Sequence, residues 1–225
     1  MPTGVALINI SALKLFLSRQ GNNSQLNSFD NYCYFPLNSE PEVSIQVLGK
    51  PYHKSQIELI RNIAINLPVG MKLLLKDHPR SHGMRKKSFY EKIFETPNIY
   101  FINPKLNSNR IISNASLVTV ISGTLGLEAI LKKKPVILFG YSKYNILSGT
   151  MMRECFNLYN LSSIIKDLLE NYLYDEVLIK NYLAATIAGS VKINLYSKLL
   201  NKPNRYSPDN KNPNNENEYD ILADY

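Results

Sequence analysis

The stretch from Leu117 to Phe139 reads LVTVISGTLGLEAILKKKPVILF, and its pattern decides the fold class. Its opening residues, LVTVI, form a continuous apolar run, which is typical of a strand buried on both faces of a parallel sheet. The small residues Ser122–Gly126 predict a tight turn, and Leu127–Leu131 predicts the start of a helix. The next apolar run, Pro135–Phe139, predicts a second strand. A strand, a helix and a strand in this order indicate a βαβ unit.

Short β-rich runs alternate with helical patterns on both sides of this unit. The patterns predict strands at Tyr32–Leu37, Met71–Lys76 and Ile99–Ile102, and helices at Ser55–Asn66, Lys87–Glu95 and Asn109–Asn114. Beyond the βαβ unit, Leu161–Leu173 and Asp175–Leu200 are expected to be mostly helical. This alternation predicts an α/β fold, a Rossmann-like parallel sheet with flanking helices.

The 225 residues suffice for one sizeable domain, which we predict over residues 31–200. Residues 1–30 are expected to be a linker or the remnant of a missing amino-terminal domain. Residues 201–225 are rich in Asn, Pro and Asp, and are expected to be disordered. No apolar run is long enough to span a bilayer, and no signal-peptide pattern opens the chain, so we expect a cytoplasmic protein.

Composition narrows the function classes. The net charge of +8 suits a nucleic-acid binder, an association with anionic membrane, or a pocket for anionic substrates. No nucleic-acid-binding motif accompanies the charge, so no nucleic-acid partner is expected. Two cysteines and three histidines lack the spacing of a disulfide framework or a metal site. The sequence also lacks the GxGxxG, GK[ST] and GxSxG motifs, which argues against dehydrogenases, ATPases and serine hydrolases.

The first candidate site is the basic motif Lys76-Asp77-His78-Pro79-Arg80, which follows a predicted strand. Pro79 restricts the backbone of His78 to extended conformations, so the imidazole can be aimed. Lys76 and Arg80 could donate hydrogen bonds to a phosphate beside it. The structural alternative is that His78 only ends a strand and faces solvent.

The second candidate site is the loop Ser122-Gly123-Thr124, which precedes a predicted helix carrying Glu128 in its first turn. Backbone amides at such a helix start suit an anion, Ser122 and Thr124 can cap the helix, and Glu128 could accept hydrogen bonds from ribose hydroxyls. The alternative is that Glu128 is only a favourable first-turn acid. We expect both candidate sites to lie at the carboxyl ends of neighbouring strands, where open α/β sheets bind ligands.

Four segments carry a resemblance to a known family. They read FPLNSEPE (Phe35–Glu42), LPVGMKLLLKDHP (Leu67–Pro79), KSFYEKI (Lys87–Ile93) and VTVISGTLGLEAILKKKPVILFG (Val118–Gly140). Together they resemble the capsule polysaccharide biosynthesis and export proteins that act as Kdo transferases in bacterial capsule assembly. The resemblance covers about residues 31–145. It implies a GT-B glycosyltransferase, of which this chain matches the carboxyl-terminal, donor-binding half.

The resemblance also implies a ligand and roles for the candidate residues. The donor would be a CMP-activated sugar, CMP-Kdo, used without a metal or other cofactor. His78 and Pro79 would hold the CMP phosphate, together with Ser122, Gly123 and Thr124, and Glu128 would meet the nucleoside. Asn38 and Glu42 are additional candidates from the first segment. Asn38 stands where the family usually has a histidine, so a contact there is expected to differ.

The implied partners are a glycan or glycolipid acceptor, a separate acceptor-binding domain or capsule assembly proteins, and the inner-membrane surface as a peripheral contact. Because only about 30 residues precede Tyr32, the acceptor domain is expected to be missing, and no catalytic base is assigned. Two alternatives stay open. The domain could be an inactive binding or assembly module of the capsule machinery, or a GT-B protein related to polyol-phosphate transferases.

Overall fold

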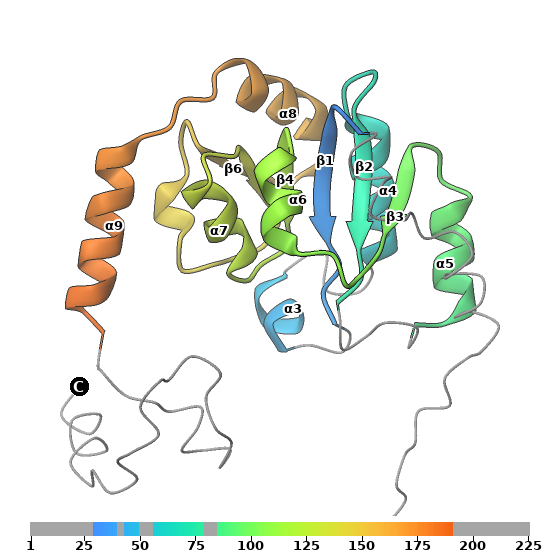
Figure 1. The fold of residues 1–225 in the computed structure, drawn as a ribbon, viewed down its shortest axis with the longest axis horizontal. Coiled ribbons are helices and arrows are strands. Elements are labelled where there is room, and N and C mark those ends of the chain that lie inside the picture. Colours follow the sequence, from blue (N-terminus) through green and yellow to red (C-terminus); the bar gives the residue numbers. More distant parts are fainter. Residues whose placement is uncertain (1–28, 40–42, 50–55, 79–84, 191–225) are drawn as a thin grey trace, which may run out of the picture. The chain divides into compact units, whose positions relative to one another are not determined.

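The computed structural model describes residues 29–39, 43–49, 56–78 and 85–190, and the side chains of residues 43–45 are not described. The chain divides into two compact units, residues 1–176 and 177–225. The first unit contains a six-stranded sheet with the order β3-β2-β1-β4-β5-β6, in which every pair of neighbours is parallel. The α/β, Rossmann-like prediction is therefore confirmed (Figure 1).

The predicted strands are present, each with its ends within one residue of the prediction. The strands are β1 (Tyr32–Pro36), β2 (Lys72–Lys76), β3 (Ile99–Ile102), β4 (Leu117–Val120), β5 (Val136–Leu138) and β6 (Met152–Glu154). The last of these, β6, was not predicted. It is a three-residue edge strand that ends on Arg153 and Glu154, so it lacks the apolar run that marked the others.

The predicted helices are also present, with two differences at their ends. The helices are α4 (Gln56–Asn66), α5 (Lys87–Phe94), α6 (Ser108–Asn114), α7 (Leu125–Leu131) and α8 (Leu161–Glu170). Helix α7 begins two residues earlier than predicted, so Gly126 lies inside the helix and not in the turn. Helix α8 ends at Glu170, three residues before the predicted end. Both differences are at helix ends, where sequence patterns are weakest.

Three short helical elements were not predicted: α3 (Val43–Leu48) and the 3₁₀ turns η2 (Asn145–Leu147) and η3 (Leu158–Asn160). Each is too short to show a helical period. In the second unit, α9 (Glu176–Ala188) lies within the predicted helical stretch, whose residues 191–200 are outside the described part. Residues 1–28 of the predicted segment 1–30 and the whole predicted segment 201–225 are also outside it. None of the described helices is both long and apolar enough to cross a membrane.

The strand order places β1 at the centre, paired with β2 on one side and β4 on the other. The chain moves outward from β1 to β3, then returns to β4 and moves outward in the opposite direction. The β1–β4 boundary is therefore the topological switch point, where open α/β sheets bind ligands beyond the carboxyl ends of the strands. The expectation that the two candidate motifs follow neighbouring strands is wrong, because β1 separates β2 from β4.

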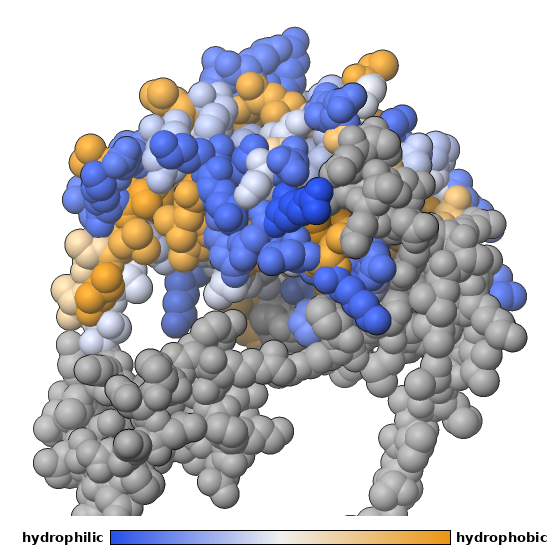
Figure 2. Space-filling view, viewed as in Figure 1, coloured by the Kyte–Doolittle hydropathy of each residue, from blue (hydrophilic) through white to orange (hydrophobic). Residues whose placement is uncertain are grey.

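Helices cover both faces of this sheet. On one face, Cys33 and Phe35 of β1 belong to a core that includes buried side chains of α4, α5 and α8. On the other face, the Tyr32 hydroxyl donates a hydrogen bond to the Ile111 carbonyl of α6 at 2.7 Å. Figure 1 shows α6 in front of the sheet and α4 behind it. Figure 2 shows that the outer surface over α6 is hydrophilic, as expected for a helix whose apolar side faces the sheet.

Candidate functional site

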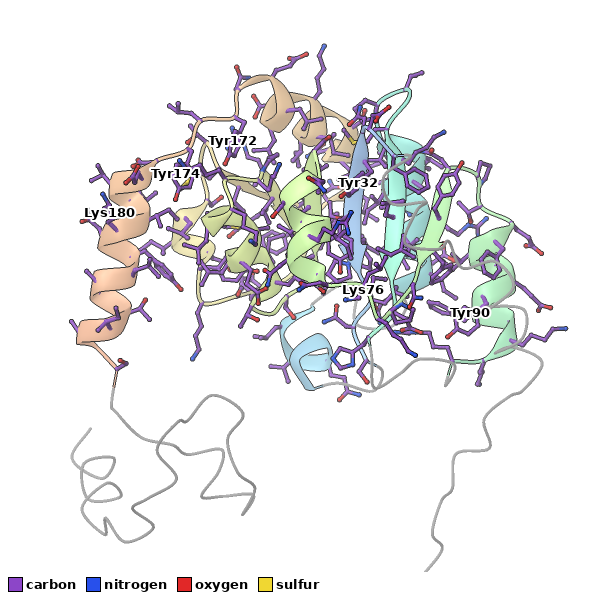
Figure 3. All side chains as sticks on the ribbon, in the orientation of Figure 1. Tyr32, Lys76, Tyr90, Tyr172, Tyr174 and Lys180 are labelled. Atoms are coloured by element: carbon purple, nitrogen blue, oxygen red, sulfur yellow. The ribbon has the colours of Figure 1, made fainter. Side chains whose placement is uncertain are left out.

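The candidate residues gather at the carboxyl edge of the central strands. Asn38 follows β1, Lys76 ends β2 and His78 follows it, and Ser122 follows β4. In Figure 3, Lys76 and Tyr90 lie toward this edge, and Tyr32 lies toward the opposite end of β1. The strand order therefore brings both candidate motifs to one edge, on either side of the end of β1.

Asp77 is the most enclosed residue of the first motif. Its buried carboxylate accepts a hydrogen bond from the Arg85 Nε at 3.2 Å and one from the Tyr90 hydroxyl at 3.0 Å. It also accepts the backbone N–H of His78 at 2.9 Å. The Arg85 guanidinium lies 4.7 Å from the centre of the Phe89 ring, which favours a cation. Asp77 therefore fixes the backbone of the half-buried His78 through this hydrogen bond.

The end of β1 is held by the same arginine. Arg85 Nη2 donates to the Asn38 carbonyl, which also accepts a bond from the Gln56 amide at 3.1 Å. The Gln56 side-chain oxygen accepts the Asn38 N–H at 3.0 Å. We call Asp77, Arg85, Tyr90, Asn38 and Gln56 the Arg85 network. It joins the ends of β1 and β2 to the starts of α4 and α5. Local sequence patterns do not predict these contacts of Arg85, Tyr90 and Gln56, because the partners are 8 to 47 residues away in the chain.

Lys76 points to a different set of partners. Its side chain is buried, and its ammonium group donates a 2.7 Å hydrogen bond to the Ser108 hydroxyl at the start of α6. Burial lowers the pKa of Lys76 below its usual value. Burial raises the pKa of the Tyr34 hydroxyl, whereas Ser108 lowers this pKa and the Glu128 carboxylate raises it. The ammonium group of Lys76 is thus held at the start of α6 by Ser108, a partner that was not predicted.

The low pKa of Lys76 predicts a pH dependence of stability. Between the lowered folded pKa and the unfolded value of about 10.4, the unfolded chain binds more protons, so stability should rise with pH. In Lys76→Met this rise should be smaller. Urea unfolding of both proteins from pH 7 to pH 10 measures the difference, and Lys105→Met, at an exposed lysine, is the control. The expectation would be contradicted if the free energies of unfolding of wild type and Lys76→Met differed by the same amount at every pH in this range.

The second motif forms a sharp turn between β4 and α7. Ser122 is only 4% exposed, and its hydroxyl is buried with no hydrogen-bond partner within the described part of the chain. Gly123 has a φ of +93°, a backbone conformation that favours glycine. Thr124 is the N-cap residue, but its side chain makes no capping bond and instead donates to the exposed Glu128 carboxylate at 3.4 Å. The predicted side-chain caps from Ser122 and Thr124 are therefore both wrong, and Thr124 pairs with Glu128.

Tyr144 fixes the backbone of this turn by a hydrogen bond. Its hydroxyl donates to the Gly123 carbonyl at 2.8 Å. A Cβ at Gly126 would lie 2.2 Å from that hydroxyl, so only glycine leaves room for the tyrosine. The sequence indicated the glycines but not Tyr144, which reaches the turn from 21 residues away.

Three candidates cannot be placed. Pro79, Arg80 and Glu42 lie outside the described residues. The others, Asn38, Lys76, His78, Ser122, Gly123, Thr124 and Glu128, all lie at or near the carboxyl edge of the sheet. Within the described part of the chain, no group of three or more His, Cys, Asp or Glu residues could hold a metal ion. The site offers hydroxyl, ammonium and carboxylate groups, a set that suits a polar, anionic ligand with hydroxyl groups.

Comparison with known proteins identifies relatives of part of this chain. Residues 17–172 match the family described as capsule polysaccharide biosynthesis protein. Protein FixF of Sinorhizobium fredii (strain NBRC 101917 / NGR234) is 37% identical over 89 residues, which are 40% of this chain and 21% of FixF. The chain therefore spans about a fifth of the length of this curated relative.

Two solved structures illustrate the structural similarity. The KpsC beta Kdo 2,7 transferase of Thermosulfurimonas dismutans has a TM-score of 0.45 and 22% identity, covering 66% of this chain and 52% of that chain. The UDP-GlcNAc 2-epimerase of Methanocaldococcus jannaschii, in complex with UDP-GlcNAc and UDP, has a TM-score of 0.50 and 17% identity, covering 80% and 52%. The chain spans about half of each. Because the family match at residues 17–172 covers more than half of the chain and includes all six strands of the sheet, the chain belongs to the capsule polysaccharide biosynthesis protein family.

Proposed function

We propose that this domain binds a CMP-activated sugar, CMP-Kdo, as the donor-binding part of a capsule glycosyltransferase. The observation that carries the proposal is the buried Ser122 hydroxyl at the topological switch point, which has no partner within the described residues. A buried polar atom without a partner costs free energy, and a ligand oxygen at this edge would supply the missing bond. Membership of the capsule family and the four resembling segments support the choice of donor.

In this proposal, different residues bind different parts of the donor. His78, held by the Arg85 network, and the turn Ser122–Thr124 meet the phosphate, and Glu128 meets the ribose hydroxyls. Donors aimed at the phosphate stabilise the negative charge that develops on the departing nucleotide. No metal or other cofactor is proposed. Transfer itself needs an acceptor-binding part with a catalytic base, and the acceptor is proposed to be a glycan or a glycolipid at the inner membrane surface.

The proposal predicts that His78→Ala and Glu128→Ala weaken CMP binding. Hydrogen bonds to charged groups contribute about 1.5–3 kcal/mol, so each substitution should weaken binding roughly 10- to 100-fold. Calorimetric titration of the full chain with CMP measures this, with Glu58→Ala on the exposed side of α4 as the control.

UDP is included as a competitor, because the fold is shared with an epimerase whose structure contains UDP. If UDP binds and CMP does not, the domain is a nucleotide-sugar binder with a different donor. If the folded chain binds neither nucleotide, the proposal is wrong. If CMP binds but no transfer to a glycan or lipid acceptor can be detected even at high protein concentration, the chain is a binding module of the capsule machinery.

A further inference from the structure

Two partly exposed aromatic side chains stack on each other at the carboxyl ends of the last two strands. Tyr141 follows β5 and Phe156 follows β6. Their ring centres are 5.2 Å apart with an angle of 27° between the planes. They are 36% and 39% exposed, whereas most aromatic side chains of the sheet are buried. We call this pair the aromatic platform.

Backbone contacts place the aromatic platform next to the phosphate-facing turn. Gly140 is wedged so tightly that a Cβ there would lie 2.6 Å from the Ile121 carbonyl and 2.4 Å from the Leu48 carbonyl. Tyr141, the next residue, donates its N–H to the Leu48 carbonyl at 2.8 Å. Ile121 directly precedes Ser122. Tyr141 of the platform therefore directly follows Gly140, which packs against the backbone of Ile121, the residue before the turn Ser122–Thr124.

The two sides of the turn differ in chemistry. On the side of α7, the Glu128 carboxylate accepts a hydrogen bond from the Thr124 hydroxyl of the turn at 3.4 Å. Toward the ends of β5 and β6, exposed apolar side chains are present, namely the aromatic platform and Leu48, which is 37% exposed. If the phosphate is held at the turn and the nucleoside at Glu128, the group on the other side of the phosphate lies toward β5. In a nucleotide sugar that group is the sugar ring.

A sugar ring fits this surface chemically. The face of an aromatic ring is electron-rich, and it attracts the weakly positive C–H groups that line one face of a pyranose. Covering the exposed rings with such a face removes apolar area from water while the sugar hydroxyls remain at the rim. We propose that Tyr141 and Phe156 form the platform on which the sugar ring of the nucleotide-sugar donor stacks. The inference rests on the proposed function and adds the sugar subsite to it.

The test compares CMP with CMP-Kdo on the full chain. Tyr141→Ala and Phe156→Ala should each weaken CMP-Kdo binding by roughly 3- to 10-fold and leave CMP binding within about twofold of wild type. Tyr141→Phe retains the ring and should bind both ligands as wild type does. Tyr159→Ala is the matched control, because this tyrosine is 97% exposed in the nearby turn η3. Thermal unfolding of each variant establishes that it is folded.

Two results would overturn the inference. An equal loss of CMP and CMP-Kdo affinity in Tyr141→Ala would mean that the pair contacts the nucleotide, through base stacking. Unchanged affinity for both ligands in both alanine variants would mean that the pair has no ligand. Should an alanine variant not fold, Tyr141→Leu and Phe156→Leu keep the apolar volume without a flat face and should show the same selective loss. Failure of the wild type to bind CMP is a separate result, and it removes the proposed function first.

Discussion

Replacing Arg85 with methionine is expected to lower the free energy of unfolding by about 3–5 kcal/mol, the usual range when one partner of a buried ion pair is removed. Arg85 and Asp77 are 6% and 0% exposed in their side chains, so water cannot replace the lost guanidinium. The substitution also removes the bond to the Asn38 carbonyl. Urea unfolding monitored by circular dichroism measures the loss.

A double-mutant cycle separates the ion pair from the rest of the Arg85 network. Asp77→Asn combined with Arg85→Met removes both charges, so the double variant should be more stable than the sum of the two single effects predicts. The surface pair Lys87–Glu91, which is about half exposed on both sides, is the control, and its removal should cost less than about 1 kcal/mol. Additive effects of Asp77→Asn and Arg85→Met would contradict a coupled buried pair.

Much of the sheet could be predicted because its strands are apolar runs bounded by turn residues. Strands β1, β2, β4 and β5 are buried along most of their length, and β3 in its last two residues, so the sequence carries a signal for each. Strand β6 has only one fully buried residue, Met152, and its pairing depends on β5 being in place. Its position is a product of tertiary contact and not of local preference.

The candidate site could be predicted only in part, for a related reason. His78, Ser122 and Glu128 belong to short local motifs, and the strand order then brings those motifs to one edge. Arg85 and Tyr144 make contacts across 47 and 21 residues, and no local pattern reports such a contact. The residues that bear the candidate chemistry are thus locally encoded, whereas the residues that hold them in place are not.

Alanine at Gly140 is expected to have the second large effect, because the segments that follow β4, β5 and α3 come into contact at this position. The added Cβ would lie 2.4 Å from the Leu48 carbonyl and 2.6 Å from the Ile121 carbonyl, and both are backbone atoms that cannot rotate away. Gly140 is not one of the glycines with a positive φ, so the cost of the substitution is steric and not a matter of backbone conformation. Overpacking of this kind typically lowers the free energy of unfolding by about 1–3 kcal/mol and occasionally by more.

The same substitution should also separate the end of α3 from the ends of β4 and β5, and so move Tyr141 away from the turn at Ser122. We therefore expect Gly140→Ala to lose affinity for CMP-Kdo by more than Tyr141→Ala does, because it displaces the turn as well as the aromatic platform. Lys143→Ala, at an exposed residue three positions further along, is the control for both measurements. Urea unfolding and titration with CMP-Kdo, performed at a temperature where every variant is folded, separate the stability effect from the binding effect. A Gly140→Ala variant with wild-type stability and wild-type affinity would show that α3 can shift freely, and the platform would then have no fixed position beside the phosphate-facing turn.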